Sequence, residues 1–313
     1  PIIGVIAVLS TQYKAEARVI SFAIVQICAG LIFYIIQSIR GKTFFNKEFW
    51  RFALSFSIPL IPHYLSQIVL GQSDRIMIDK MIGASEAAIY GVSYNLAAVI
   101  TLFVNAINNS FVPTLYESLK SKKCENIKKV AAFLAIFMAG LICVFMLFGP
   151  EILTVFVAPE YIKAKWIFPP VAASMFFTFI YVFYVNVEFY FEKTNYVMFV
   201  SVLGAVVNII LNLVFIKKYG FIAAGYTTVF SYLVFCFAHY LLYKYIAKKE
   251  KTGNVYNDSI FMILGIAVLA FMLICILLYK FNIVRYILIA LIAVFAVIFR
   301  KKLIYAFKKA LNK

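Results

Sequence analysis

The sequence is poor in charged residues, and poorest in acidic ones. Of its 313 residues, only 14% are Asp, Glu, Lys or Arg, with 13 acidic against 30 basic side chains. A soluble domain carries about 25% charged residues, because its surface has to be hydrated. The low charge therefore excludes an ordinary soluble fold, and the 65% of hydrophobic residues indicates a protein surrounded by lipid.

Residues that carry chemistry are also scarce. The chain has two histidines and five cysteines, and the cysteines show neither CxxC nor metal-ligand spacing. The sequence contains no HExxH, GxSxG, Walker lysine loop or GxGxxG pattern, and no acidic pair suited to metal or glycosyl transfer. We therefore predict that the protein is not an enzyme, that it has no catalytic residue, metal or cofactor, and that its cysteines are reduced packing residues.

What the sequence does contain is a series of nine apolar runs without Asp, Glu, Lys or Arg. Each is long enough, or nearly so with its flanks, to cross a hydrocarbon core of about 30 Å as a helix. Backbone polar groups in lipid must be satisfied within the segment, so we predict an all-α polytopic membrane helix bundle. The runs are Ile20–Ile39, Phe52–Leu70, Ala87–Tyr116, Val130–Pro150, Trp166–Val187, Thr194–Ile216, Tyr219–Tyr243, Ser259–Tyr279 and Tyr286–Phe299.

The basic residues of the joints predict the orientation. Taken alternately from Arg40–Arg51, one set of joints holds 20 basic residues and the other set holds 8. Short loops with the basic excess face the cytoplasm, so we predict a cytoplasmic C-terminus. The excess of basic residues is then a topology signal rather than a nucleic-acid site.

The densest charge cluster, residues 73–80, lies at the end of a span. Arg75 and Asp79 are four residues apart and share a helical face. Pro59 and Pro62 precede them and are expected to kink this helix. Two readings stay open, namely an ion pair that ends the span, and an Arg that lines a cavity and holds a diphosphate through its planar fork.

Amides occur in the middle of two spans. Asn105, Asn108 and Asn109 share one helical face, and Asn208 and Asn212 repeat the spacing of four residues. Against lipid these groups would be costly, so they face protein or water. Packing against a neighbouring helix and lining of a cavity are both open.

Three ionisable residues fall inside the runs or at their ends. Glu188 is intramembrane, which favours a function, although Lys193 one turn later is close enough for an ion pair at the membrane edge. His63 follows Pro62, and His239 lies in a later span. For both histidines a packing role and a proton relay are open.

Several short motifs follow one another from about Phe52 to Tyr245. The motifs are Ser57-Ile58-Pro59-Leu60-Ile61-Pro62-His63, Ser73-Asp74-Arg75, Ile89-Tyr90-Gly91-Val92-Ser93-Tyr94, Ala158-Pro159-Glu160-Tyr161, Trp166-Ile167-Phe168-Pro169, Asn208-Ile209-Ile210-Leu211-Asn212, Lys218-Tyr219-Gly220 and Ala223-Ala224-Gly225. Their order and spacing resemble Wzx-type polysaccharide flippases, which are part of the superfamily of multidrug and oligosaccharidyl-lipid exporters. Ala88 departs from that family, where a Gly often precedes the Ile-Tyr pair.

The resemblance implies two six-helix lobes that give alternating access to a central cavity. On that pattern residues 1–51 are the end of helix 5, helix 6 and the interlobe linker, residues 52–250 are a complete second lobe, and residues 251–313 are two additional C-terminal transmembrane helices and a basic tail. The first nine residues look like the tail of another span, so the chain is expected to be N-terminally truncated.

The resemblance also implies a function. The substrate would be an undecaprenyl-diphosphate-linked oligosaccharide, flipped across the bacterial cytoplasmic (inner) membrane for O-antigen, lipopolysaccharide or capsule synthesis. The implied partners are this lipid, the membrane lipids, a polysaccharide polymerase and a chain-length regulator, with no nucleic acid. The residues expected to bind substrate are Arg75, Asp74, Asn105, Asn109 and Glu188, and those expected in coupling or gating are His63, Pro59, Pro62 and Asp79.

Three alternatives stay open. A multidrug or cation antiporter of the same superfamily would need coupled carboxylates buried in a lobe. A membrane saccharide polymerase or ligase would carry a long outer loop, whereas no predicted extramembrane segment exceeds about 15 residues. A scaffold without transport activity would tolerate alanine at the Arg and Asn positions.

Overall fold

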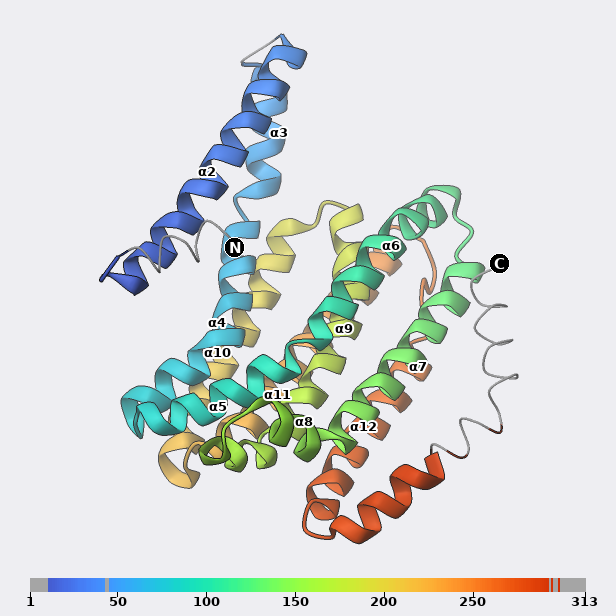
Figure 1. The fold of residues 1–313 in the computed structure, drawn as a ribbon. Helices are drawn as coiled ribbons and strands as arrows, with labels where there is room; N and C mark the ends of the chain where they lie inside the picture. Colours follow the sequence, from blue (N-terminus) through green and yellow to red (C-terminus); the bar gives the residue numbers. More distant parts are fainter. Residues whose placement is uncertain (1–10, 43–44, 293, 295–297, 299–313) are drawn as a thin grey trace. The chain divides into compact units, whose positions relative to one another are not determined.

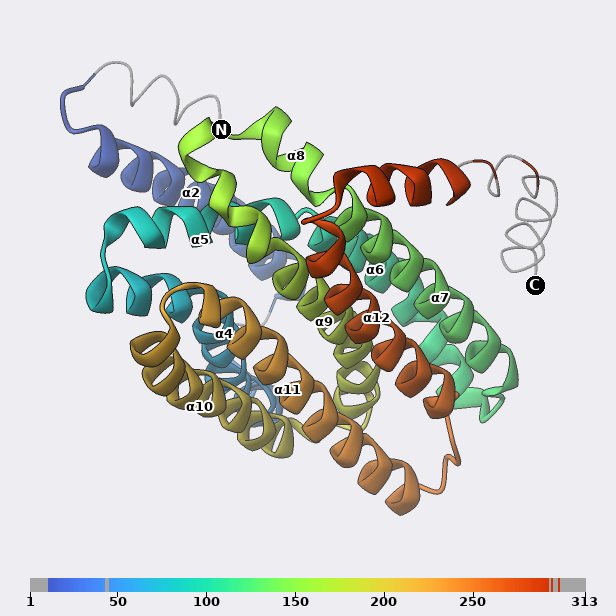
Figure 2. The same ribbon diagram turned by 90° about the horizontal axis from the view of Figure 1, so that it is seen from below.

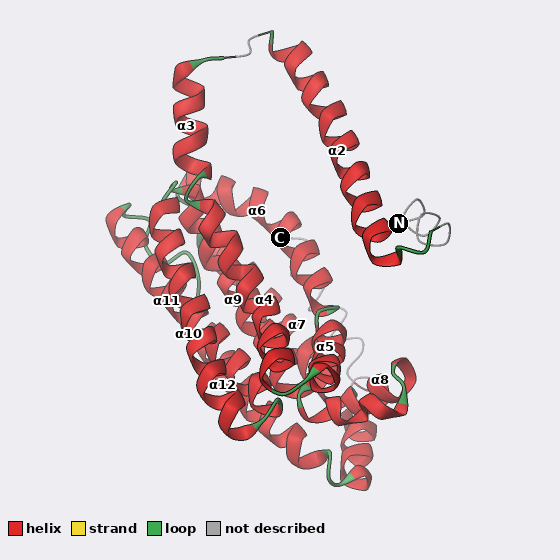
Figure 3. Ribbon diagram, turned by 90° about the vertical axis from the view of Figure 1, so that its left-hand side faces the viewer, coloured by secondary structure: helices red, strands yellow, loops and turns green. Residues whose placement is uncertain are grey.

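The computed structural model describes residues 11–42, 45–292, 294 and 298, and every regular element in this part of the chain is a helix (Figure 3). The prediction of an all-α protein is therefore confirmed. The first nine residues and the basic tail 300–313, for which we made predictions, lie outside the described residues.

The chain divides into two compact units, Pro1–Ser55 and Phe56–Lys313. The first unit contains α2 (Lys14–Gly41) and most of α3 (Lys47–Ser57). Helix α2 ends at Gly41 and is capped by Lys42, which has a left-handed φ of 51° and donates its N–H to the carbonyl of Ser38. The assignment of three segments to lobes stays a prediction.

The second unit holds the other helices in an order that follows the predicted runs (Figure 1). They are α4 (Leu60–Met81), α5 (Ala84–Ala97), α6 (Ile100–Ser121), α7 (Glu125–Leu147), α8 (Gly149–Phe156), the 3-10 helix η1 (Pro159–Trp166), α9 (Phe168–Tyr190), α10 (Thr194–Tyr219), α11 (Ile222–Lys249), α12 (Asp258–Leu278) and a further helix Asn282–Ile292.

Eight helical segments of the described chain are long and apolar enough to cross a membrane. They coincide with the first eight predicted runs, and the ninth run falls partly outside the described residues. The chain is a multi-pass membrane protein. The segments are Glu16–Gly41, Lys47–Met81, Ala84–Ser121, Glu125–Leu147, Phe168–Tyr190, Thr194–Tyr219, Ile222–Lys249 and Asp258–Leu278.

Helix α9 is the central helix of the second unit. It packs against α11, α7 and α12, and Figure 2 shows it between these helices. In its most apolar window 89% of the residues are buried, against 28% for α12. A helix that is apolar all round is stable when neighbours cover all its sides. Any polar side chain of α9 therefore needs a partner on a neighbouring helix.

A turn interrupts the second run at Pro59, one of the two prolines that were expected to kink it. Helix α3 ends at Ser57, a turn covers Ile58 and Pro59, and α4 begins at Leu60. Proline lacks an N–H and clashes with the preceding turn, so it is tolerated only near a helix start. Pro62 accordingly lies in the first turn of α4, where its carbonyl accepts the Ser66 hydroxyl over 2.7 Å.

Candidate functional site

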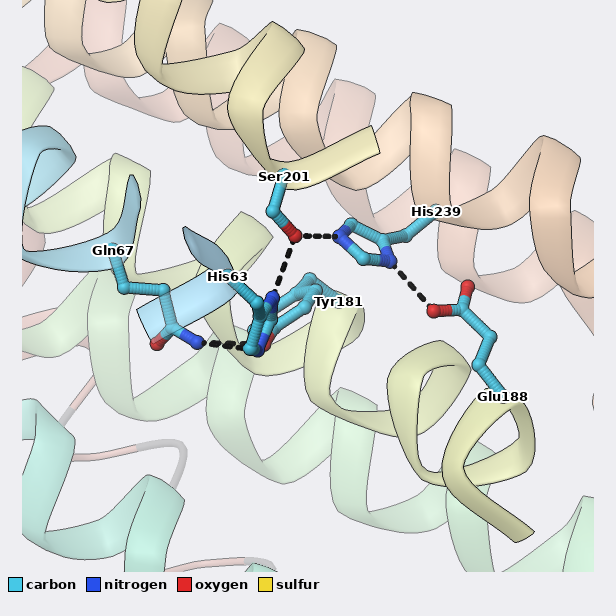
Figure 4. Close-up of polar contacts among 6 residues, drawn as sticks. All are labelled: His63, Gln67, Tyr181, Glu188, Ser201 and His239. Atoms are coloured by element: carbon cyan, nitrogen blue, oxygen red, sulfur yellow. Dashed lines mark hydrogen bonds and ion pairs between the residues drawn. The ribbon is translucent and has the colours of Figure 1, made fainter. Parts of the chain in front are cut away.

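Two groups of buried polar side chains lie along α4, which packs against α10 and also contacts α5 and α11. The first group, which we call the His63 cluster, is centred on His63 in the first turn of α4. The second group, which we call the Asp74 cluster, lies about three helical turns later along α4. The His63 cluster consists of His63, Gln67, Tyr181, Glu188, Ser201 and His239 (Figure 4). The Asp74 cluster consists of Asp74, Tyr90, Asn208, Asn212 and Thr228.

Four side chains of the His63 cluster form a line across four helices. Glu188 Oε2 on α9 lies 2.8 Å from His239 Nδ1 on α11, and His239 Nε2 lies 3.2 Å from Ser201 Oγ on α10. Ser201 Oγ lies 2.6 Å from His63 Nδ1 on α4. All four residues are fully buried, so each polar contact is shielded from solvent (Figure 4).

The line continues beyond His63 to a less buried end. Gln67 Nε2, one turn further along α4, lies 2.8 Å from His63 Nε2 and donates to Tyr181 Oη over 3.1 Å. Tyr181 Oη is also 3.3 Å from His63 Nε2. Gln67 is half-buried whereas Glu188 at the other end is fully buried. The cluster therefore leads from a partly accessible amide to an enclosed carboxylate.

The proposed pairing of Glu188 with Lys193 at the membrane edge is wrong. Lys193 instead forms an ion pair with Glu250 over 3.2 Å, beyond the end of α11. Glu188 points inward because α9 is covered on all sides, and its Oε1 has no hydrogen-bond partner among the described residues. His239 is then the partner of the carboxylate, which sequence spacing does not reveal.

The Asp74 carboxylate is fully buried and accepts hydrogen bonds on both oxygens. Tyr90 Oη and Thr228 Oγ1 donate to Oδ2 over 2.5 and 2.7 Å. Asn208 Nδ2 donates to Oδ1 over 3.2 Å, and Asn212 Nδ2 also donates to Oδ1. Hydrogen bonds to an ionised acceptor are about twice as strong as neutral ones, so this arrangement holds a carboxylate.

The two amides of α10 are held in turn by hydroxyls. Ser73 donates to Asn208 Oδ1 over 2.7 Å, and Thr227 donates to Asn212 Oδ1 over 2.5 Å. For Asn208 and Asn212 both packing against a neighbouring helix and lining of a cavity were open. The structure shows packing, because both side chains of α10 contact Asp74 on α4. Asp74 was expected to bind substrate, but its carboxylate is occupied by protein donors in this conformation.

Arg75, the next residue on α4, points elsewhere. Its Nη2 donates to Asn95 Oδ1 over 2.9 Å, and its guanidinium carbon lies 4.8 Å from the centroid of the Tyr94 ring. The suggested ion pair with Asp79 is absent from the described residues, and Asp79 is exposed. Arg75 is half-buried, and its Nε has no partner in the described chain.

The three Asn side chains of α6 separate into two environments. Asn108 accepts a hydrogen bond from Asn186 Nδ2 of α9 over 2.7 Å, as expected of a packing residue. Asn105 and Asn109 are exposed. Asn108 is therefore a packing residue between α6 and α9. The side chains of Asn105 and Asn109 lie on the exposed surface of α6.

The described residues contain no group of three or more His, Cys, Asp or Glu that would hold a metal ion. All five cysteines are free; Cys236 and Cys275 are buried, Cys124 and Cys143 are half-buried, and Cys28 is exposed, so the packing role does not extend to Cys28 in the described structure.

Several members of both clusters were missed from the sequence. Gln67, Ser201 and Tyr181 follow no motif, Tyr90 lies in one of the quoted motifs but was given no role, and Thr228 lies in an apolar run. The only usable signal was that two histidines and one carboxylate lie inside or beside spans, where such groups rarely occur without partners.

Comparison with known proteins gives a consistent picture. A family of polysaccharide biosynthesis proteins matches residues 2–119. A protein of the Lsg locus of Haemophilus influenzae is 24% identical over 201 residues, which are 62% of this chain and 50% of that protein. An uncharacterized membrane protein of the same organism is 28% identical over 200 residues, which are 61% of this chain and 49% of that protein. The chain thus spans about half the length of these two relatives.

Among solved structures, the chain resembles the Vibrio cholerae MATE transporter VcmN in its bent form. The TM-score is 0.52 at 16% sequence identity, over 80% of this chain and 56% of the transporter. At this identity the likeness concerns the fold alone. Residues 2–119 thus match polysaccharide biosynthesis proteins, and the helical bundle shares the fold of a membrane transporter.

Proposed function

We propose that this chain is part of a transporter that flips an undecaprenyl-diphosphate-linked oligosaccharide across the cytoplasmic membrane for surface polysaccharide synthesis. The observation that carries the proposal is the pair of exposed amides, Asn105 and Asn109, in the middle of an apolar span. An amide that faces hydrocarbon without a partner costs several kcal/mol, so this face of α6 is expected to border water or a polar substrate.

Saccharide hydroxyls suit these amides. Each carboxamide offers two donors and one acceptor oxygen, and a sugar hydroxyl both donates and accepts. Asn108 on the same helix shows what a packing amide does here, because it bonds Asn186 inside the bundle. Asn105 and Asn109 are exposed within one turn of this bonded amide. This difference favours a substrate path along the face of α6 that carries Asn105 and Asn109.

Arg75 suits the diphosphate. Among the described residues its guanidinium makes one side-chain hydrogen bond, to Asn95, although guanidinium groups carry five N–H donors. It is half-buried, which lowers the screening of its charge while leaving it reachable. Asp74 is enclosed by protein hydrogen-bond donors, and Glu188 is enclosed by neighbouring side chains. We therefore assign both residues to the conformational change of the transporter rather than to substrate contact.

The match of residues 2–119 to polysaccharide biosynthesis proteins supports this choice of substrate class. The transporter-like fold supports movement around a site between helices, but it does not select a substrate. Lipid-linked substrate and membrane lipids are the partners that this proposal requires.

The test compares Asn105→Leu/Asn109→Leu with Asn108→Leu in the protein as its host makes it. The double variant is expected to abolish surface polysaccharide and to keep the melting temperature in detergent. Asn108→Leu is the matched control and is expected to lower the melting temperature, because Asn186 loses its acceptor. A stable and fully active double variant would remove the main support for the proposal.

Arg75 gives a second test of the same substrate. Arg75→Ala and Arg75→Lys are both expected to lose surface polysaccharide at unchanged expression, since Lys lacks the bidentate fork. Normal polysaccharide in Arg75→Ala would leave the residue only its contact with Asn95 and Tyr94.

A cation antiporter is the second candidate function. It is favoured by two carboxylates, Asp74 and Glu188, that are fully buried in one helical unit. An antiporter predicts that a deletion strain becomes sensitive to drugs while its surface polymer is unchanged. A flippase predicts that the strain loses surface polymer while its drug sensitivity is unchanged.

A further inference from the structure

The contacts of the His63 cluster assign a direction to its hydrogen bonds. Gln67 Nε2 lies within reach of both His63 Nε2 and Tyr181 Oη, and an amide nitrogen only donates. His63 Nε2 is therefore an acceptor, and a neutral imidazole then carries its proton on Nδ1. That proton points at Ser201 Oγ, 2.6 Å away.

The same reasoning continues to the carboxylate. Since Ser201 Oγ accepts from His63, its own hydroxyl proton is directed to His239 Nε2, 3.2 Å away. His239 then carries its proton on Nδ1 and donates it to Glu188 Oε2 over 2.8 Å. Each donor along the line from Gln67 to Glu188 Oε2 then has an acceptor, with both imidazoles neutral and Glu188 ionised, and Glu188 Oε1 has no partner among the described residues.

One added proton reverses the direction of the hydrogen bonds along this line of side chains. It binds His63 Nε2 once Gln67 turns its Oε1 toward the ring, and the Nδ1 proton of His63 passes to Ser201 Oγ. The original Ser201 proton passes to His239 Nε2, and the Nδ1 proton of His239 passes to Glu188 Oε2. Within the cluster four N–H or O–H bonds form and three break, and the fourth bond broken is an O–H bond of a hydronium ion at the Gln67 end. The cluster therefore gains a single proton, which leaves Glu188 neutral.

We infer that the His63 cluster is a proton-binding site which takes up one proton at the His63 end, stores it on Glu188, and couples its release to transport. The coupling part rests on the proposed function, and the proton-binding part does not. The half-buried Gln67 is the entry, and Glu188 is the enclosed end.

The surroundings leave Glu188 with no other source of neutralisation. Among the described residues only His239, whose imidazole is neutral in this arrangement, lies within ion-pair distance of Glu188, and Lys193, the nearest lysine in sequence, is bound to Glu250. A carboxylate in an apolar interior is costly unless it is paired or protonated. The titratable groups on the helices around the cluster include Tyr64 and Asp74 on α4, Tyr181 and Tyr184 on α9, Tyr232 and Cys236 on α11, and Tyr196 on α10.

Movement of a helix would break the line, which is how proton binding can be coupled to a conformational change. Its four principal residues come from α4, α9, α10 and α11, and each contact spans two different helices. A shift of one helix by a few ångströms would separate an imidazole from its partner and leave a buried group unpaired. The ionised and neutral states of Glu188 therefore favour different helix arrangements.

The test uses the protein as its host makes it, purified into lipid nanodiscs with ¹⁵N-labelled histidine. As the pH falls, the wild type is expected to take up one proton per chain at this site. Both imidazoles are expected to change together from the Nδ1–H to the Nε2–H tautomer, which ¹⁵N chemical shifts distinguish. Signals are assigned with His63→Gln and His239→Gln.

Two variants and a matched control decide the inference. Glu188→Gln is expected to lose the proton uptake, and Ser201→Ala is expected to uncouple the tautomer of His63 from that of His239. Ser231→Ala is the control, because Ser231 is equally buried and, among the described residues, its hydroxyl donates to the Thr227 carbonyl of its own helix. Unchanged uptake in Glu188→Gln, or independent titration of the two wild-type imidazoles to imidazolium, would overturn the proton site.

Flipping under an imposed pH gradient tests the coupling separately. Glu188→Gln is expected to lose the stimulation by the gradient that Ser231→Ala retains. Retained stimulation in Glu188→Gln would overturn the coupling while the proposed function stands. Absence of flipping in the wild type would refute the proposed function, and the proton-uptake measurement would still decide the site.

Discussion

His239 Nδ1 lies 2.8 Å from Glu188 Oε2, although the two residues are 51 positions apart and belong to different helices. Neither side chain is exposed. In an apolar bundle this contact fixes α9 against α11, because moving either helix would leave a buried polar group without its partner.

The first prediction concerns this pair. Glu188→Ala and His239→Ala are each expected to destabilise the fold by about 3 kcal/mol or more, because each leaves the other group buried without its partner. The double variant is expected to lose less than the sum of the two, as for any directly coupled pair. Melting temperatures in detergent measure this, and additive losses would show that the two side chains do not interact.

Asp74 is expected to tolerate no loss of its charge. In Asp74→Asn an amide N–H would replace one acceptor oxygen and face two hydrogen-bond donors. We expect a loss of about 2 kcal/mol or more, seen as a lower melting temperature. Asp79→Asn is the matched control on the same helix, and because Asp79 is exposed its effect should stay within about 0.5 kcal/mol. Equal behaviour of the two variants would contradict the observed donor set.

The orientation in the membrane is the third prediction. In a background without the natural cysteines, Lys120→Cys is expected to resist an impermeant thiol reagent in intact cells, and Lys163→Cys is expected to react. Both positions are exposed, so accessibility within the protein is matched. Labelling in the opposite pattern would reverse the predicted topology.

Cys124 offers a pH-dependent check on the same loop. Burial raises the pKa of the Cys124 thiol, so less thiolate is present at neutral pH than at an exposed cysteine. In opened membranes its reaction with a thiol reagent is expected to be slower than that of Lys120→Cys at neutral pH. The difference should shrink as the pH rises through the pKa of Cys124, and rates that are equal at neutral pH would contradict the burial.

The fourth prediction concerns the helix Asn282–Ile292. Arg285 is buried and binds both oxygens of Glu151 on α8, with Nη1 to Oε2 at 2.9 Å and Nη2 to Oε1 at 2.5 Å. Its Nη1 also lies 3.4 Å from the Leu147 carbonyl. Arg285→Ala is expected to release this helix, which hydrogen exchange of residues 282–292 would show as faster exchange.

Arg285→Lys is expected to have a smaller effect than Arg285→Ala, because one ammonium keeps the charge but not the two parallel bonds. Lys280→Ala is the control, since Lys280 is exposed and lies before the helix. Unchanged exchange in Arg285→Ala would mean that apolar packing alone holds the helix.

The sequence determined the eight described membrane-spanning segments, because apolar length is a local property. A run without charge, such as Thr194–Ile216, has to become a helix in lipid, and it does so as α10 with little change in its bounds. Pro59 likewise determined where the second run breaks, since proline acts on its own helical turn.

The sequence also indicated that Glu188, His63 and the Asn residues needed partners, but it did not say which. Helical spacing suggested Lys193 for Glu188 and Asp79 for Arg75, and neither pair forms in the described chain. Spacing along one helix shows which residues share a face, whereas the partner on another helix depends on how the helices are rotated and offset.

Tertiary structure decided the rest. It placed His239, Ser201 and His63 in line with Glu188, and it directed Tyr90, Thr228 and two amides at Asp74. It also turned Asn108 into the bundle while leaving Asn105 and Asn109 outside, although all three share a helix. These differences arise because packing α9 against α6, α10 and α11 rotates each helix by a fraction of a turn that no local pattern encodes.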